Sequence, residues 1–490
     1  MSTCLGGKGY AILKEALDME DFKALKKELT AQAYLPKSPV QPPSFPIYRE
    51  SPKKIYIPRY YGVDTYGSPD EIKLTAGEPI DVPFVGALRD YQDKIVAQYL
   101  SHATPDHATP DHATLGAACG GGGLLEIPCG RGKTVIALQI IAKLKRKTLV
   151  IVHKGFLLNQ WLERIQEFLP SAKVGRIQGP VIDIDGKDIV IGMLQSLSMK
   201  EYPETMFASF GLTIVDECHH ISSEVFCRSL QKIITMYTLG LSATMERKDG
   251  LTHVFKLFLG PIVYSEQREN TDPVLVKAIQ YISTDDEFNE TVYDYRGNPA
   301  FSTMISKLCA SSHRSEFILK VLQEELNLEP DQQVMILAHN RNVLTYLHDA
   351  IAHRKIADGS VGYYLGGMKE AVLKQTETKK VIIATYAMAA EALDIKTLTT
   401  LIMATPKTDI IQAVGRILRV KHKRPMVIDI VDTHDMFKNQ FAKRRKFYKA
   451  SNYTVQQTTS VLYGSREKQV KKKNTTEPAP TISKCLVVLN

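Results

Sequence analysis

Apolar and polar positions alternate with two periods between about Leu88 and Gly260. Short apolar runs are followed by segments whose apolar residues recur at helical spacing, as in LLEI before TVIALQIIAKL and TLVIV before FLLNQWLERIQEF. Strands that alternate with amphipathic helices are typical of βαβ units on a parallel sheet. We therefore predict an α/β domain in this part of the chain.

The same alternation returns from about Gln333, where the predicted strands are VMILAH, VIIATY, TLIMAT and MVIDIVD. The pattern thus predicts two similar α/β domains in tandem, at residues 81–265 and 266–450. An accessory module at residues 1–80 precedes them. A polar tail at residues 451–490 follows them and is predicted to be mobile.

The accessory module differs in composition from the two domains. It begins with a helix-like stretch, YAILKEALDMEDFKALKKEL, continues through the Pro-rich segment LPKSPVQPPSFP and ends in YRESPKKIYIPRYYG. The Tyr, Arg and Lys residues of the last segment suit stacking on single-stranded nucleic acid. The alternation in KKIYIPRYY fits an edge strand equally well, so both interpretations stay open.

Overall composition narrows the class of protein. At ~150 residues per domain, 490 residues leave room for about three domains. The 62 Lys and Arg exceed the 53 Asp and Glu, and the resulting charge of +9 permits a polyanionic partner without requiring one. The seven cysteines form no CxxC pair, and no apolar run approaches the ~20 residues that span a bilayer. We expect an intracellular protein with reduced thiols and no membrane segment.

A low-complexity insert, HATPDHATPDHAT, occupies residues 102–114. Its period of five residues matches neither a helix nor a strand, so we predict a surface loop. Its histidines are interpreted as solvated repeat residues rather than metal ligands.

A glycine-rich loop that ends on a lysine lies between the predicted strand LLEI and the predicted helix TVIALQ. The glycines let backbone N–H groups surround phosphates, the lysine neutralises the β and γ oxygens, and the threonine hydroxyl reaches Mg²⁺. Ile127 stands where the strict GxxxxGK[ST] pattern has its first glycine. The residues predicted to bind the nucleotide here are Cys129, Gly130, Arg131, Gly132, Lys133 and Thr134.

A second predicted strand, LTIV, is followed by the acidic residues Asp216 and Glu217. Asp216 is suited to hold Mg²⁺ directly or through water, and Glu217 to orient and deprotonate the attacking water. A solvent-exposed strand end is the alternative interpretation. The adjacent CHH has no second ligand cluster at zinc spacing, so we predict no zinc site. The lysine loop and the acidic pair together predict hydrolysis of ATP with Mg²⁺.

Three motifs in order, DECH at 216–219, SAT at 242–244 and QAVGRILR at 412–419, resemble those of superfamily 2 helicases and translocases. The resemblance is closer to the XPB-like branch and its relatives in large DNA viruses, including poxvirus-type transcript-release helicases, and covers roughly residues 80–450. It implies two RecA-like domains and an ATP-dependent motor on nucleic acid, with DNA preferred over RNA and the transcription machinery as a candidate partner.

The resemblance also implies roles for single residues. LRDYQ at 88–92 is similar to the entry motif of the family, which implies that Gln92 reads the adenine edge and that Arg89 belongs to the nucleotide site. Ser242 and Thr244 are implied to couple the state of the ATP to the grip on nucleic acid.

In the second predicted domain, ATYAMAAEALDI matches the AT…EGLDI pattern of the family. The match implies that Thr385 contacts a nucleic-acid phosphate and that Asp394 helps to close the nucleotide cleft. Ala392 replaces the usual glycine, which leaves the backbone path there open.

Gln412, Arg416 and Arg419 fall on one predicted helix. The two arginines are three residues apart and project from one helix face, which is the geometry of arginine fingers that stabilise a transferring phosphoryl group. Two surface arginines on an amphipathic helix are the alternative. Ala413 stands where the family often has an arginine, so one expected basic contact is missing from the pattern.

Polar residues also follow several predicted strands. His153 and Lys154 follow TLVIV, Gln195 and Ser196 follow DIVIGM, and Thr385 ends a strand of the second domain. Open parallel sheets bind ligands at the carboxyl ends of their strands. We therefore predict that Lys154, Gln195, Ser196 and Thr385 contact nucleic acid.

Two further segments allow a structural and a functional interpretation. Trp161 lies among apolar residues at helical spacing, so we predict that it packs in the core and does not stack on bases. FKNQFAKRRKFYK at 437–449 could grip phosphates or form a solvated helix face. Its basic residues are Lys438, Lys443, Arg444, Arg445, Lys446 and Lys449.

Two classes of function stay open: a nucleic-acid motor, and a scaffold built on a degenerate motor without turnover. The hydrolytic residues predicted above are all present, which favours the motor. Unwinding, translocation without unwinding and transcript release remain alternatives within that class. For a viral protein, the expected location is the host cell, with the virion as a second site.

Overall fold

The computed structural model describes residues 2–35, 40–104, 121–128, 130–203, 205–220, 223–246, 249–266, 274–391, 395–418 and 422–463. The chain divides into two compact units, Met1–Arg268 and Glu269–Asn490. Most of the HATPD repeat, the tail beyond residue 463, and the residues Cys129, Asp394 and Arg419 lie outside the described residues, as does the side chain of Arg416. Among the described helices, none is long and apolar enough to cross a membrane.

The described part of the first unit contains an eight-stranded sheet in the order β11-β10-β12-β9-β13-β14-β8-β15. Its pairings are parallel, except that β11 runs antiparallel to β10. The strands are β8 (Gly122–Glu126), β9 (Thr148–Val152), β10 (Val174–Gln178), β11 (Val181–Asp183), β12 (Ile189–Met193), β13 (Leu212–Val215), β14 (Tyr237–Ser242) and β15 (Ile262–Ser265). The helices are α3 (Asp90–Ala103), α4 (Lys133–Leu144), α5 (Gly155–Phe168), α6 (Leu194–Met199), α7 (Ser223–Leu230) and α8 (Thr252–Leu259).

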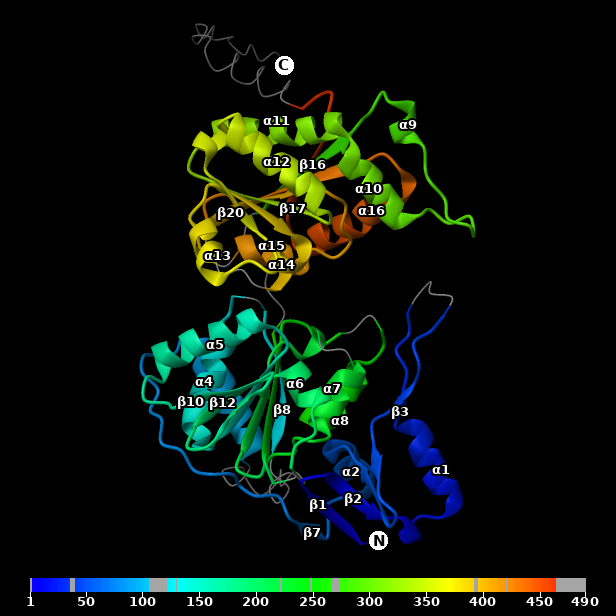
Figure 1. The fold of residues 1–490 in the computed structure, drawn as a ribbon, viewed down its shortest axis with the longest axis vertical. Helices are drawn as coiled ribbons and strands as arrows, with labels where there is room; N and C mark the ends of the chain where they lie inside the picture. Colours follow the sequence, from blue (N-terminus) through cyan, green and yellow to red (C-terminus); the bar gives the residue numbers. More distant parts are fainter. Residues whose placement is uncertain are drawn as a thin grey trace, which may run out of the picture. The chain divides into compact units, whose positions relative to one another are not determined.

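Helices cover both faces of this sheet (Figure 1). One core contains apolar residues of α3, α4 and α5, and the other contains residues of α6, α7 and α8. Strands covered on both faces are continuously apolar, and every residue of β9 and β13 is buried. The predicted alternation of strands and crossover helices is confirmed for this unit.

The N-terminal residues form a five-stranded sheet in the order β5-β6-β2-β1-β7, within the described residues. Its strands are β1 (Thr3–Gly6), β2 (Gly9–Leu13), β5 (Arg49–Glu50), β6 (Lys54–Ile57) and β7 (Glu71–Ile72), and β3 (Thr30–Ala31) pairs with β4 (Phe45–Pro46) beside it. The helices are α1 (Met19–Glu28) and α2 (Arg59–Tyr66).

One prediction for this part was wrong, and one of the two interpretations left open does not hold. The helix-like stretch at 10–29 begins as β2, because its first apolar residues pack into a core. The helix α1 begins only after Asp18, whose side chain caps it by accepting the N–H groups of Glu20 at 2.9 Å and Asp21 at 2.7 Å. KKIYIPRYY is no edge strand, because β6 lies between β5 and β2. The strand ends before Pro58, which has no N–H to donate, and RYY begins α2.

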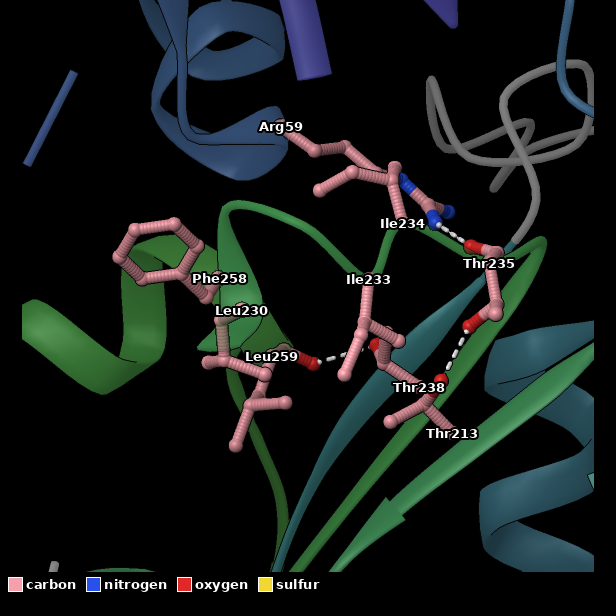
Figure 2. Close-up of a pocket in the computed structure, with 9 residues that line it drawn as sticks. All are labelled: Arg59, Thr213, Leu230, Ile233, Ile234, Thr235, Thr238, Phe258 and Leu259. Carbon is pink, nitrogen blue, oxygen red and sulfur yellow. Dashed lines mark hydrogen bonds between the residues drawn. The ribbon is translucent and has the colours of Figure 1, made fainter. Parts of the chain in front are cut away.

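Arg59 joins this N-terminal sheet to the larger one (Figure 2). Arg59 is 3% exposed, and its guanidinium donates to the carbonyls of Thr235 and Met236, each at 3.0 Å. Figure 2 shows the bond to Thr235 beside a small pocket, where the Thr235 hydroxyl also donates to that of Thr213 at 2.9 Å. Arg59 therefore serves in packing and is too buried to stack on nucleic acid, which corrects that interpretation for this residue.

The described part of the second unit contains a seven-stranded parallel sheet in the order β18-β19-β17-β20-β21-β16-β22. Its strands are β16 (Leu275–Tyr281), β17 (Gln333–Ala338), β18 (Val361–Tyr364), β19 (Val381–Thr385), β20 (Leu398–Met403), β21 (Met426–Asp432) and β22 (Thr454–Thr459). The helices are α9 (Asp286–Asn289), α10 (Phe301–Ala310), α11 (Ser312–Leu328), α12 (Arg341–His353), α13 (Glu370–Glu377), α14 (Tyr386–Glu391), α15 (Ile411–Ile417) and α16 (Asp435–Ala450). The tandem α/β architecture predicted from the pattern is confirmed (Figure 1).

The basic segment at 437–449 forms α16, and one of its arginines is buried. Arg444 is 1% exposed and makes two 2.8 Å hydrogen bonds to the carboxylate of Asp429 on β21. The Tyr448 hydroxyl donates to the same carboxylate at 2.9 Å. Arg444 thus anchors the helix to the sheet and cannot grip phosphates, because a fixed ion pair already occupies its guanidinium.

Candidate active site

The lysine loop joins β8 to α4 through two glycines in left-handed conformations. Gly130 has φ 84° and Gly132, the residue before the first turn of α4, has φ 79°. Residues with a Cβ rarely adopt such angles, so the sequence needs glycine at both places. The loop places Lys133 and Thr134 at the N-terminus of α4, where free N–H groups and the helix dipole favour an anion.

The structure brings the predicted lysine and acidic residues together. β8 and β13 both pair with β14, so their carboxyl ends lie at one edge of the sheet. Lys133 Nζ lies 3.2 Å from Glu217 Oε1, and the two side chains are 11% and 23% exposed. This ion pair forms a half-buried, charged centre at the position where the fold binds ligands.

Asp216 follows β13 and is held by two donors. The Trp161 indole N–H donates to Oδ2 at 2.8 Å, and the N–H of Glu217 donates to Oδ1 at 3.0 Å. Burial of Asp216, together with the neighbouring Glu217 charge, raises its pKa to about 6. Trp161 packs in the core as predicted, being 1% exposed, but its bond to Asp216 was missed because 55 residues separate them in the sequence.

Trp161→Phe is expected to lower the kcat of ATP hydrolysis by about tenfold. Phenylalanine keeps the apolar packing but removes the N–H donor, and a hydrogen bond to a charged group contributes about 1.5–3 kcal/mol. Steady-state ATPase rates would measure the change. Leu162→Ala on the same helix, where Leu162 is 37% exposed, is the control and is expected to change kcat less than about twofold. Equal rates for both variants would contradict the inference that the Trp161 N–H positions the Asp216 carboxylate.

Ser242 contacts the acidic segment through His219. Ser242 Oγ lies 2.6 Å from His219 Nδ1, which lies 3.4 Å from Glu217 Oε2. Thr244 is linked to Ser242 by its N–H at 3.2 Å and its carbonyl at 2.5 Å. The end of β14 is thus connected to the Lys133–Glu217 ion pair. The resemblance had implied that Ser242 and Thr244 hydrogen-bond toward the acidic residues, but sequence reasoning considered His219 only as a zinc ligand and missed its place in this bridge.

Gln92 lies beneath the lysine loop. Its Oε1 accepts the Arg89 N–H at 3.0 Å, and its Nε2 donates to the Arg131 carbonyl at 3.1 Å. Gln92 is buried, with 6% of the residue exposed. The Tyr91 hydroxyl donates to the same carbonyl at 3.1 Å, and the Arg131 guanidinium lies 3.9 Å from the Tyr91 ring centroid. A Cβ on Gly132 would come within 2.5 Å of Gln92 Nε2. The entry motif therefore supports the loop, and its role toward adenine stays a prediction.

The residues predicted to contact nucleic acid lie at carboxyl ends of strands. Gln195 and Ser196 belong to the short helix α6 rather than to a loop. Gln195 Nε2 donates to the His153 carbonyl at 3.1 Å, so the ends of β12 and β9 are joined. Lys154 precedes α5, and burial lowers its pKa. In the second unit Thr385 ends β19 and is partly buried.

Gln412 is the second residue of α15 and is partly buried. The backbone of Arg416 belongs to the same helix, which ends at Ile417. The predicted arginine fingers are the side chains of Arg416 and Arg419. The side chain of Arg416 and all of Arg419 lie outside the described residues, so their role stays a prediction.

Comparison with known proteins follows this geometry. Residues 86–247, which contain the lysine loop and the acidic pair, match the family model described as the res subunit of type III restriction enzymes. The chain is 35% identical over 460 residues to a protein of Acanthamoeba polyphaga mimivirus that is named as an ATP-dependent RNA helicase, covering 91% of this chain and 85% of that protein. It is 26% identical to the DNA 3'-5' translocase XPB2 of Sulfurisphaera tokodaii, over 70% of this chain and 81% of the relative.

Among solved structures, a variant of S. cerevisiae Dbp5 bound to RNA and ADP BeF3 is similar in fold. The TM-score is 0.51 at 13% identity, over 77% of this chain and 93% of that one. This likeness supports the tandem RecA-like fold alone. Because the mimivirus relative is matched over most of both chains, this chain belongs to the family of superfamily 2, ATP-hydrolysing helicases that includes those of large DNA viruses.

Proposed function

We propose that the chain couples ATP hydrolysis at the Lys133–Glu217 centre to movement along nucleic acid. The observation that carries this proposal is the 3.2 Å contact between Lys133 Nζ and Glu217 Oε1, with Asp216 beside it. It brings a phosphate-neutralising cation, a general base and a metal-binding carboxylate to one edge of the first sheet.

Each residue has a separate task in the proposed reaction. Lys133 binds the β and γ oxygens of ATP, together with the N–H groups at the start of α4. Glu217 orients the attacking water and accepts its proton. Trp161 and the backbone keep Asp216 in place, so that its carboxylate needs no reorientation when the nucleotide binds.

The residues present fit Mg²⁺. The Thr134 hydroxyl and the Asp216 carboxylate supply hard oxygen donors, which this ion prefers, and Asp216 is only 6% exposed. When bound, Mg²⁺ neutralises charge that develops on the phosphate oxygens. Gln92, itself held by the Arg89 N–H, supports the loop through its bond to the Arg131 carbonyl, and we assign the adenine contact to Gln92.

The link Glu217–His219–Ser242 supports a coupling route. A change at Glu217 during hydrolysis would reach the end of β14 through two contacts. We propose that the second unit adds Asp394, Gln412, Arg416 and Arg419 to the nucleotide. Arginine fingers increase phosphoryl-transfer rates by about 10³–10⁵-fold.

The proposal also specifies which nucleic acid, DNA or RNA, is the substrate. The mimivirus relative is named for RNA and the archaeal relative for DNA. We retain DNA as the preferred substrate, with Lys154, Gln195, Ser196 and Thr385 as contacts. A role in transcription and a location in the host cell are parts of the same proposal.

ATP turnover is expected to increase with nucleic acid, and more with DNA than with RNA of equal length. ATPase rates with single-stranded DNA, duplex DNA and RNA would measure this, with strand displacement on 3′- and 5′-tailed duplexes as the assay of unwinding. Equal stimulation by DNA and RNA would remove the DNA preference. Absence of turnover with all three polymers would favour the scaffold alternative.

A further inference from the structure

A groove between α16 and the outer strands of the second sheet has a volume of about 390 Å³. This size falls within the range of roughly 300–1,000 Å³ that is usual for ligand sites. It lies wholly within the second unit. The residues that give it its chemistry are Gln280, Val431, Lys438, Phe441, Gln457 and Thr459.

The strand register explains why the groove exists. Gln280 pairs with Val431 on one side and with Thr459 on the other, and Ala278 pairs with Asp429 and Gln457. All these side chains therefore point to the face that α16 covers. The Arg444–Asp429 pair holds α16 over β21. β22 forms the edge of the sheet beside α16. The small side chain of Ala278 leaves space between the sheet and the helix.

The lining groups match the chemistry of a nucleotide. The Phe441 ring offers a stacking surface, and the amides of Gln280 and Gln457 both donate and accept hydrogen bonds, as the edge of an unpaired base requires. Lys438 is 50% exposed at the first turn of the helix, where its Nζ lies 3.4 Å from Oδ1 of the exposed Asp435, and a phosphate would compete with that carboxylate for the ammonium. Gln280, Val431 and Thr459 lie at or next to the carboxyl ends of their strands, the usual side for ligands of such sheets.

We propose that this groove binds one nucleotide of a single-stranded nucleic acid, with its base against Phe441 and its phosphate at Lys438. The inference rests on the proposed action on nucleic acid and adds to it a contact at the far edge of the second sheet, where four strands separate β22 from β19 and Thr385. It also gives α16 a role in binding in which Arg444 contacts no phosphate but lies over the Phe441 ring, 5.6 Å from its centroid.

The full chain would be titrated with fluorescein-labelled oligothymidylate and oligouridylate in the absence of ATP. Phe441→Leu and the double variant Lys438→Gln/Gln457→Ala are each expected to increase Kd by about tenfold, because stacking and phosphate contacts are lost. ATPase activity without nucleic acid is expected to stay unchanged. The two oligonucleotides distinguish DNA from RNA as the source of the nucleotide.

Lys320→Gln/Gln323→Ala is the matched control, because it makes the same two changes on exposed positions of α11. Photo-crosslinking with oligonucleotides that carry 5-bromouracil gives a second readout, expected in the peptides of α16 and β22. If the unaltered chain binds and both groove variants keep its Kd within about twofold, the groove proposal is overturned while the proposed function stands. If the unaltered chain binds neither oligonucleotide, both fail.

Discussion

Glu217→Gln is expected to lower the kcat of ATP hydrolysis by about 10²–10⁴-fold, the usual contribution of a general base. Glutamine keeps the size of the side chain but cannot accept the proton of the attacking water. It also removes the charge that pairs with Lys133 at 3.2 Å, so binding of the anionic nucleotide should not weaken. Steady-state ATPase rates give kcat, and nucleotide titration gives Kd.

The control for this substitution is Glu201→Gln, because Glu201 is 92% exposed and pairs with Lys232 away from the site. Its expected kcat equals that of the unaltered chain. Lys133→Ala is expected to lose turnover together with nucleotide affinity, which separates its role from that of Glu217. Full turnover in Glu217→Gln would remove the general base from the proposed mechanism.

Arg444→Ala is expected to destabilise the second unit by about 3–5 kcal/mol, because it leaves the Asp429 carboxylate buried without its cation. Both side chains of the pair are 1% exposed, so water cannot replace the guanidinium. Hydrogen exchange of β21 and α16 amides, followed by mass spectrometry, measures the free energy of opening in this unit alone.

Arg445→Ala changes the next residue of the same helix, which is exposed. Its expected effect on stability is within about 0.5 kcal/mol. If both variants opened equally easily, the buried pair would not be the anchor of α16.

The lysine loop and the acidic pair, which form the proposed hydrolytic centre, could be located from local sequence. Gly130, Gly132 and Lys133 form a contiguous loop, and a buried strand that ends on acidic residues places Asp216 and Glu217 at a sheet edge. Each pattern depends on neighbours in the chain, so its chemistry is visible before folding. The structure then joins the two patterns in one ion pair.

Other parts of the site depend on contacts between distant segments. Trp161 lies 55 residues before Asp216, and Ser242 lies 23 residues after His219, so no periodicity could indicate these bonds. The packing roles of Arg59 and Arg444 could not be predicted from the sequence either. Arg59 and Arg444 sit among basic and aromatic neighbours that look like a binding surface, yet both are buried in packing contacts.

The tandem α/β architecture, the glycine-rich lysine loop and the acidic pair can be recognised in the sequence alone, because hydrophobic period and glycine placement are local properties of the chain. Which polar groups are used in packing and which remain at a surface depends on contacts between distant segments, so it becomes visible only in the folded protein. The register of β16, β21 and β22 and the anchoring of α16 create the groove beside Phe441. The groove depends on how the strands pair and on where α16 is anchored, and the spacing of residues in the sequence predicts neither.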